Sequence, residues 1–61
     1  MAQITSKELS GISDQLAIEQ NLIAKYKSYA QTTQDMVLKA KYDDIAQKHQ
    51  KHFEALYANL K

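Results

Sequence analysis

Gln31-Thr32-Thr33-Gln34-Asp35 divides the chain into two segments, each with the composition and residue spacing of a helix. The stretch is polar, and its residue types favour helix caps and turns over helix interiors. Asp35 is the expected N-cap of the second helix. Because so short a connection makes two helices antiparallel neighbours, the stretch predicts a helical hairpin.

The first helix has a predicted start near residue 6. Thr5-Ser6-Lys7-Glu8 fits a capping box, and Ile4 and Leu9 stand where a hydrophobic staple would place them. Residues 1–4 are expected to form a short tail. The sequence therefore predicts one helical-hairpin domain over residues 1–61, with a helix at about 6–31, a turn at about 32–35 and a helix at about 36–60.

Both segments carry apolar residues at alternating steps of three and four, which is the spacing of a packed helix seam. Two helices cannot cover two wide apolar stripes by themselves. We therefore expect an all-α fold in which the hairpin pairs with a second copy, about a two-fold axis, into a four-helix bundle. The seam positions are Leu9, Ile12, Leu16, Glu19, Ile23, Tyr26 and Ala30, then Leu38, Tyr42, Ile45, His49, His52 and Leu56, widened by Leu22, Tyr29, Ala46 and Phe53.

Length and composition exclude several classes of function. A chain of 61 residues without cysteine has neither a disulfide nor a cysteine-based zinc site, so oligomerisation is the expected source of extra stability. Eight lysines, no arginine and a net charge of +1 give no electrostatic footprint for nucleic acid. No apolar run is long enough to span a membrane, and the first residues lack the features of a signal peptide, so an intracellular protein is expected.

Three ionisable residues stand at seam positions: Glu19 on the first helix, and His49 and His52 on the second. Counted from a turn centred on Thr33, Glu19 and His49 differ in height by roughly 3 Å, and Glu19 and His52 by roughly 7–8 Å. The i,i+3 spacing of the histidines lets both imidazoles point the same way. The three side chains are therefore expected to converge.

Two interpretations of this convergence stay open. A carboxylate and two imidazoles suit a divalent transition metal such as Fe, Mn or Zn, and a dimer would double the set to two Glu and four His, enough for a dinuclear site. Alternatively, the histidines satisfy a buried Glu in a structural polar layer that fixes register, to which Tyr26 and Tyr42 can add a hydrogen bond. The metal ligands, if there is an ion, are Glu19, His49 and His52.

The sequence shows no machinery for hydrolytic or transferase chemistry. It contains no Ser/His/Asp or Cys/His arrangement, no glycine-rich phosphate loop, and no carboxylate pair placed for acid–base work. We therefore expect a protein that is not an enzyme. A helical adaptor that captures another protein's helix on its exposed stripe is a further alternative.

Three stretches, Ile4–Leu16, Glu19–Tyr26 and Ala46–Phe53, resemble the small spore coat F family of spore-forming Firmicutes. That family is similar to one half-bundle of the ferritin-like superfamily, whose pattern is Glu, then Tyr seven residues later, and Glu-x-x-His on the next helix. Glu19 and Tyr26 match the first element and His52 matches the histidine, whereas His49 occupies the Glu position. The resemblance implies a ferritin-like bundle built from two copies.

The resemblance also implies a role. The leading expectation is a structural spore coat or coat-associated protein that assembles as a homodimer, with other coat proteins as further partners and the spore coat as its location. The alternative is a metal-binding or metal-redox bundle that uses Glu19, His49 and His52. Because His49 replaces a carboxylate, the match to a di-iron oxidase is incomplete.

Overall fold

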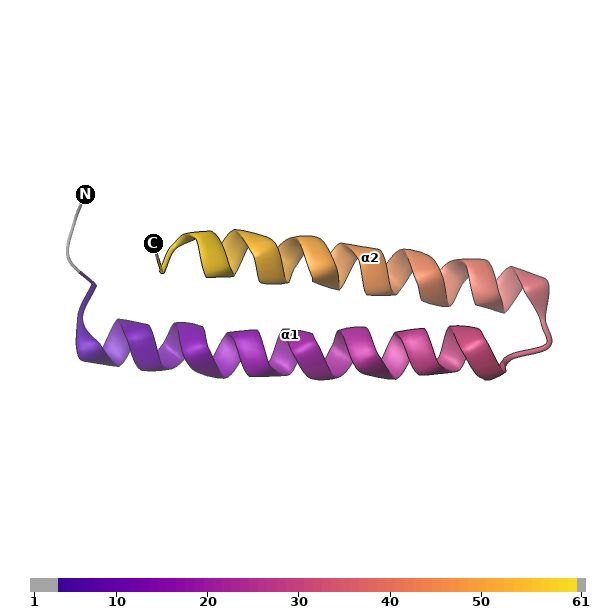
Figure 1. Ribbon diagram of the computed structural model, residues 1–61, viewed down its shortest axis with the longest axis horizontal. Coiled ribbons are helices and arrows are strands. Elements are labelled where there is room, and N and C mark those ends of the chain that lie inside the picture. The colour runs from indigo at the N-terminus through magenta and orange to yellow at the C-terminus, as the bar shows by residue number, and fades with distance from the viewer. Residues whose placement is uncertain (1–3, 61) are drawn as a thin grey trace.

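The computed structural model describes residues 4–60 and places two antiparallel helices side by side (Figure 1). Helix α1 spans Ser6–Thr32 and helix α2 spans Met36–Ala58, and the described residues contain no strand. The predicted all-helical hairpin is thus confirmed. The predicted tail falls mostly outside the described residues, which do not include 1–3 or 61.

Local hydrogen bonds explain where both helices begin. At α1, the Glu8 amide donates to Oγ1 of Thr5 at 3.1 Å and the Thr5 amide donates to Oε1 of Glu8 at 3.3 Å, which completes the expected capping box. At α2, Oδ1 of Asp35 accepts from the amides of Val37 and Leu38 at 2.9 and 3.1 Å. Both caps satisfy backbone donors that the first helical turn leaves without partners.

The helix ends differ slightly from the predicted ones. Helix α1 runs to Thr32, one residue further than expected, and the Thr33 amide closes its last turn on the Tyr29 carbonyl at 3.0 Å. Helix α2 ends at Ala58 rather than near 60. Its last turn tightens because the Leu60 amide donates to the Tyr57 carbonyl, a step of three residues, at 3.0 Å.

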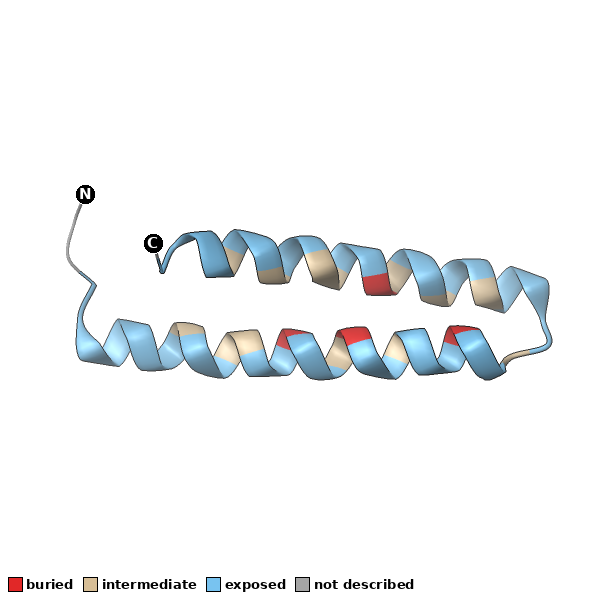
Figure 2. Cartoon of the chain, viewed as in Figure 1, coloured by how far each residue is buried: buried red, intermediate tan, exposed pale blue. Residues whose placement is uncertain are grey.

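The hairpin is a single layer of two helices. It measures 47 × 17 × 11 Å, and only Glu19, Ile23, Ala30 and Ala46 are buried among residues 4–60 (Figure 2). The remaining seam residues are half-buried or exposed, so two helices do not complete a core. No helix within residues 4–60 is both long and apolar enough to span a membrane.

The two broad sides of the hairpin have opposite chemistry. The residue before each buried position is large and apolar (Ile18, Leu22, Tyr29 and Ile45), whereas the residue after it is small or polar (Gln20, Ala24, Gln31 and Gln47). Because the helices are antiparallel and both right-handed, the same step turns both helices toward the same side of the hairpin. We call one side the apolar face (Ile18, Leu22 and Tyr29 of α1; Leu38, Ile45 and Leu56 of α2) and the other the polar side (Gln20, Ala24 and Gln31; Ala40, Gln47 and Glu54).

Much of the apolar face is open to solvent. Ile18 is 50% exposed, Tyr29 42% and Leu38 40%, while Leu22, Ile45 and Leu56 are half-buried. His52 also lies on this face, since it precedes the half-buried Phe53 by one residue. The apolar face therefore presents large apolar side chains to solvent on one side of the hairpin.

Candidate metal centre

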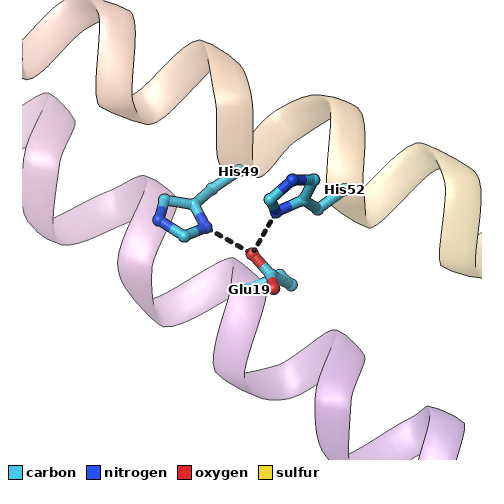
Figure 3. Close-up of side chains that lie close together, drawn as sticks. All are labelled: Glu19, His49 and His52. Atoms are coloured by element: carbon cyan, nitrogen blue, oxygen red, sulfur yellow. Dashed lines mark hydrogen bonds and ion pairs between the residues drawn. The ribbon is translucent and has the colours of Figure 1, made fainter.

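The structure brings Glu19, His49 and His52 together at the middle of the hairpin (Figure 3). Nδ1 of His49 lies 2.5 Å from Oε1 of Glu19, and Nδ1 of His52 lies 3.8 Å from the same oxygen. One ligand atom from each residue fits within a span of 4.8 Å. We call these three residues the Glu–His cluster.

The residues of the Glu–His cluster differ less in height along the hairpin than residue counting from Thr33 predicts. The helices end at Thr32 and resume at Met36, so the midpoint of the connection is Gln34. Glu19 and His49 both lie 15 residues from this midpoint, and His52 lies three residues further on. The expected height differences of roughly 3 and 7–8 Å were therefore too large, and both histidines reach one carboxylate oxygen.

Hydrogen bonds satisfy the buried carboxylate on both of its oxygens. Oε1 of Glu19 pairs with His49, and Oε2 accepts from the side-chain amide of Gln15 at 3.1 Å. Gln15 is the contributor that the seam pattern missed, although its i,i+4 spacing from Glu19 is the signal that finds it. The pair with His49 is the main cause that holds the pKa of Glu19 below its usual range, and it outweighs the opposing effect of burial.

The lowered pKa of Glu19 also decides the direction of its bond to His49. An ionised carboxylate only accepts hydrogen bonds, so Nδ1 of His49 must carry the proton and donate it to Oε1. A metal ion bound here through Nδ1 would require that proton to move to Nε2, because the ligating nitrogen of a neutral imidazole carries no proton.

Aromatic rings line the side of the cluster nearer the turn. The ring of Tyr26 stacks on His49 with centroids 6.4 Å apart and planes 9° apart, and Tyr42 lies 6.1 Å from Tyr26. The expected hydrogen bond from Tyr26 or Tyr42 to Glu19 is not formed among the described residues, whose polar contacts to Glu19 come from Gln15, His49 and His52. Tyr26 instead stacks on the His49 ring, and Tyr42 packs against Tyr26.

The donor set fits a small divalent cation. In a tetrahedral zinc site the Zn–N and Zn–O bonds are about 2.0–2.2 Å, so neighbouring ligand atoms lie about 3.4 Å apart. The two contacts to Oε1, at 2.5 and 3.8 Å, bracket that separation. Because all three ligand atoms lie within 4.8 Å of one another, small side-chain rotations would bring them to the spacing of a three-ligand site.

Comparisons with protein-family models, with curated proteins and with solved structures find no match to this chain. The geometry of the Glu–His cluster must therefore be interpreted from its own chemistry. The resemblance to coat F proteins remains a prediction drawn from the residues.

The pKa of Glu19 leads to a testable pH dependence. Because folding lowers this pKa below its usual 4.5, the stability that the charged carboxylate contributes is complete above that pH and is lost as pH falls through the lowered value. We expect the difference in unfolding free energy between wild type and Glu19→Gln to be largest at pH 7 and to shrink toward pH 3. Urea denaturation followed by circular dichroism, at one protein concentration, measures this difference.

The comparison with Glu19→Gln isolates one carboxylate because all other titrating groups are shared by the two proteins. A difference in unfolding free energy that is the same at pH 3 and pH 7 would contradict the prediction. It would mean that Glu19 has the same pKa in the folded and unfolded chains.

Proposed function

We propose that this chain is a structural, non-enzymatic protein that homodimerises through its apolar face into a ferritin-like four-helix bundle. The observation that carries the proposal is the one-sided chemistry of the hairpin. An apolar face on one side and a polar side opposite are what one half of a bundle requires, since one surface meets the partner and the other meets water.

The exposed area supports a second copy as the occupant of the apolar face. The hairpin has an accessible surface of 4872 Å² for a mass of 7.0 kDa. A compact monomer of this mass exposes about 4000 Å², so the excess is roughly 800 Å². That excess is about the area that each partner buries in a standard interface.

A second copy also matches the apolar face in shape and chemistry. Two-fold pairing sets the same patch against itself, so an extended apolar patch with a polar reverse side is complementary to its own copy. The patch runs along α2 from Leu38 near the turn to Leu56 near the open end, and along α1 from Tyr29 to Ile18. Packing two such layers encloses the half-buried seam residues and gives the chain the core that one hairpin lacks.

Two substitutions on either side of buried Ala46 test the interface. Ile45→Glu places a charge on the apolar face, whereas Gln47→Glu places the same charge on the polar side. We expect Ile45→Glu to weaken dimerisation at least about 10-fold, because a buried unpaired charge is costly, and Gln47→Glu to leave it unchanged. Sedimentation velocity over a range of concentrations measures both dissociation constants, and circular dichroism checks the helix content.

A folded wild-type monomer at micromolar concentration would exclude the homodimer. Equal dissociation constants for Ile45→Glu and Gln47→Glu would instead place the interface away from the apolar face. The two results are distinguishable, since the first concerns wild type and the second only the variants.

For the biological setting, we propose a spore coat or coat-associated role. The support is the resemblance of Ile4–Leu16, Glu19–Tyr26 and Ala46–Phe53 to small spore coat F proteins. A small, regular, self-pairing helical unit is suited to repeated assembly in a protein layer, where other coat proteins would be its further partners.

Fractionation of purified spores tests the coat role. We expect antibodies against the chain to detect it in the coat extract and not in the lysate of the spore core, since a structural coat protein remains with its layer. Ile45→Glu should enter the coat less efficiently than Gln47→Glu if incorporation requires the dimer. Detection mainly in vegetative cells would contradict the coat assignment.

The Glu–His cluster favours a second candidate function, the binding of a divalent transition metal. Three donor atoms of the types that zinc, iron and manganese accept lie within 4.8 Å, and two of the residues come from a different helix than the third. An ion at this point links α1 to α2 near the middle of the hairpin. This cross-link between the helices stabilises a fold whose small core contributes little stability by itself.

Thermal denaturation with and without zinc chloride tests this candidate on untagged protein. Zinc at 100 times its Kd should stabilise the folded state by about 2.7 kcal/mol and raise the Tm, because it binds the folded chain preferentially. His49→Ala should abolish the increase, whereas Lys48→Ala, an exposed neighbour outside the Glu–His cluster, should retain it. A Tm that ignores zinc, manganese and iron alike would end this proposal.

A further inference from the structure

The Glu–His cluster opens onto the apolar face. The exposed fraction of the side chains rises across it, from 8% for Glu19 to 24% for His49 and 62% for His52. His52 lies on the apolar face itself, beside the surface that a second copy would cover. The metal-ligating cluster and the docking surface thus share one residue.

The carboxylate can serve one ion per chain. Oε2 of Glu19 is engaged by Gln15, and Nδ1 of each histidine is directed at the remaining oxygen, Oε1 (Figure 3). An ion held by these three residues has three protein ligands. A tetrahedral site has four positions, so one position stays open, and in a lone hairpin it is reached through the exposed His52.

Burial of His52 couples metal binding to dimerisation. Its Nδ1 is 3.8 Å from Oε1 of Glu19, which is too long for a hydrogen bond. In the single hairpin the His52 side chain is 62% exposed, so water can reach that nitrogen. When a second copy covers the apolar face the water is removed, and a buried polar nitrogen without a partner opposes association.

A bound ion removes that obstacle. Coordination would give Nδ1 of His52 a partner and fix the ring, so that this nitrogen no longer opposes association. The second copy in turn covers the open coordination position and excludes solvent from the ion. Each event therefore favours the other.

The Glu–His cluster lies near mid-length of the hairpin, so the coupling acts in the same way in both copies. Glu19 is the 14th of the 27 residues of α1, which is its middle. A two-fold axis that runs along the bundle, or one that crosses it at mid-length, sets the clusters of the two copies at the same level. Each copy then closes the site of the other.

We propose that the Glu19–His49–His52 cluster is a zinc-type site that a second copy of the chain closes, so that metal binding controls dimerisation. The inference rests on both proposed functions, the dimer and the metal site. Linkage is reciprocal: with one zinc per chain, the factor by which zinc tightens the dimer equals the product of the factors by which dimerisation tightens zinc binding at the two sites.

Sedimentation velocity of the untagged full chain tests the linkage, first with a chelator and then with one equivalent of zinc chloride. We expect zinc to lower the dimer Kd by about 10- to 100-fold, the range usual for coupled sites. Elemental analysis of the dialysed protein should find one zinc per chain. His49→Ala, which changes the buried end of the Glu–His cluster and leaves the apolar face intact, should abolish the zinc effect.

Three variants at neighbouring positions separate coordination from packing. His52→Leu replaces the unsatisfied nitrogen with an apolar side chain. Its dimer Kd should be no higher than that of wild type measured with a chelator, and it should not change when zinc is added. His52→Ala should also ignore zinc. Lys51→Ala, an exposed neighbour outside the Glu–His cluster, should respond to zinc as wild type does.

Three outcomes overturn the inference, and each does so differently. If zinc binds and the dimer Kd does not change, the linkage is wrong while the metal site stands. If no zinc binds, the metal site and the linkage both fall while the dimer stands. If the chain stays monomeric with and without zinc, the dimer and the linkage fall together.

Discussion

A pair of helices has only one contact line, and the rest of this structure follows from that constraint. Along the line, small residues such as Ala30 and Ala46 let α1 and α2 approach, and little else is fully buried. Within residues 4–60, most other apolar side chains are left partly in water. Because the apolar face gathers several of them on one side, the hairpin has the chemistry of a layer that packs against another layer.

The same constraint makes buried Glu19 unusual. The few positions on the contact line are the strongest stabilisers that the hairpin has, and one of them holds a carboxylate. Its bonds to His49 and Gln15 offset the desolvation that burial imposes, and the bond to His49 fixes the register of α2 against α1. Without an ion the Glu–His cluster is a polar layer, so the structural and the metal interpretations describe the same residues.

Local signals in the sequence predicted the fold better than they predicted the site. Thr5 and Asp35 mark the helix starts because their caps are formed by residues close in the chain. The convergence of Glu19 with the histidines was predicted. The predicted height differences depend on where the turn is centred, because an error of one residue in the turn centre changes the height difference between two residues on opposite helices by about 3 Å. Gln15 was missed because a seam pattern ranks residues by hydrophobicity and overlooks a polar neighbour that serves a buried charge.

In the four-helix bundle that we propose, a histidine at position 49, where the ferritin-like pattern has a carboxylate, limits the kind of metal chemistry. Di-iron sites in bundle cores use carboxylates from several helices, with a Glu-x-x-His pair supplying both types of ligand. Here one copy offers a single carboxylate, and Gln15 already occupies one of its oxygens. Two such copies supply two carboxylates and four imidazoles, a nitrogen-rich set that suits one separate ion in each chain. That arrangement favours a metal that holds helices and copies together over one that activates oxygen between two irons.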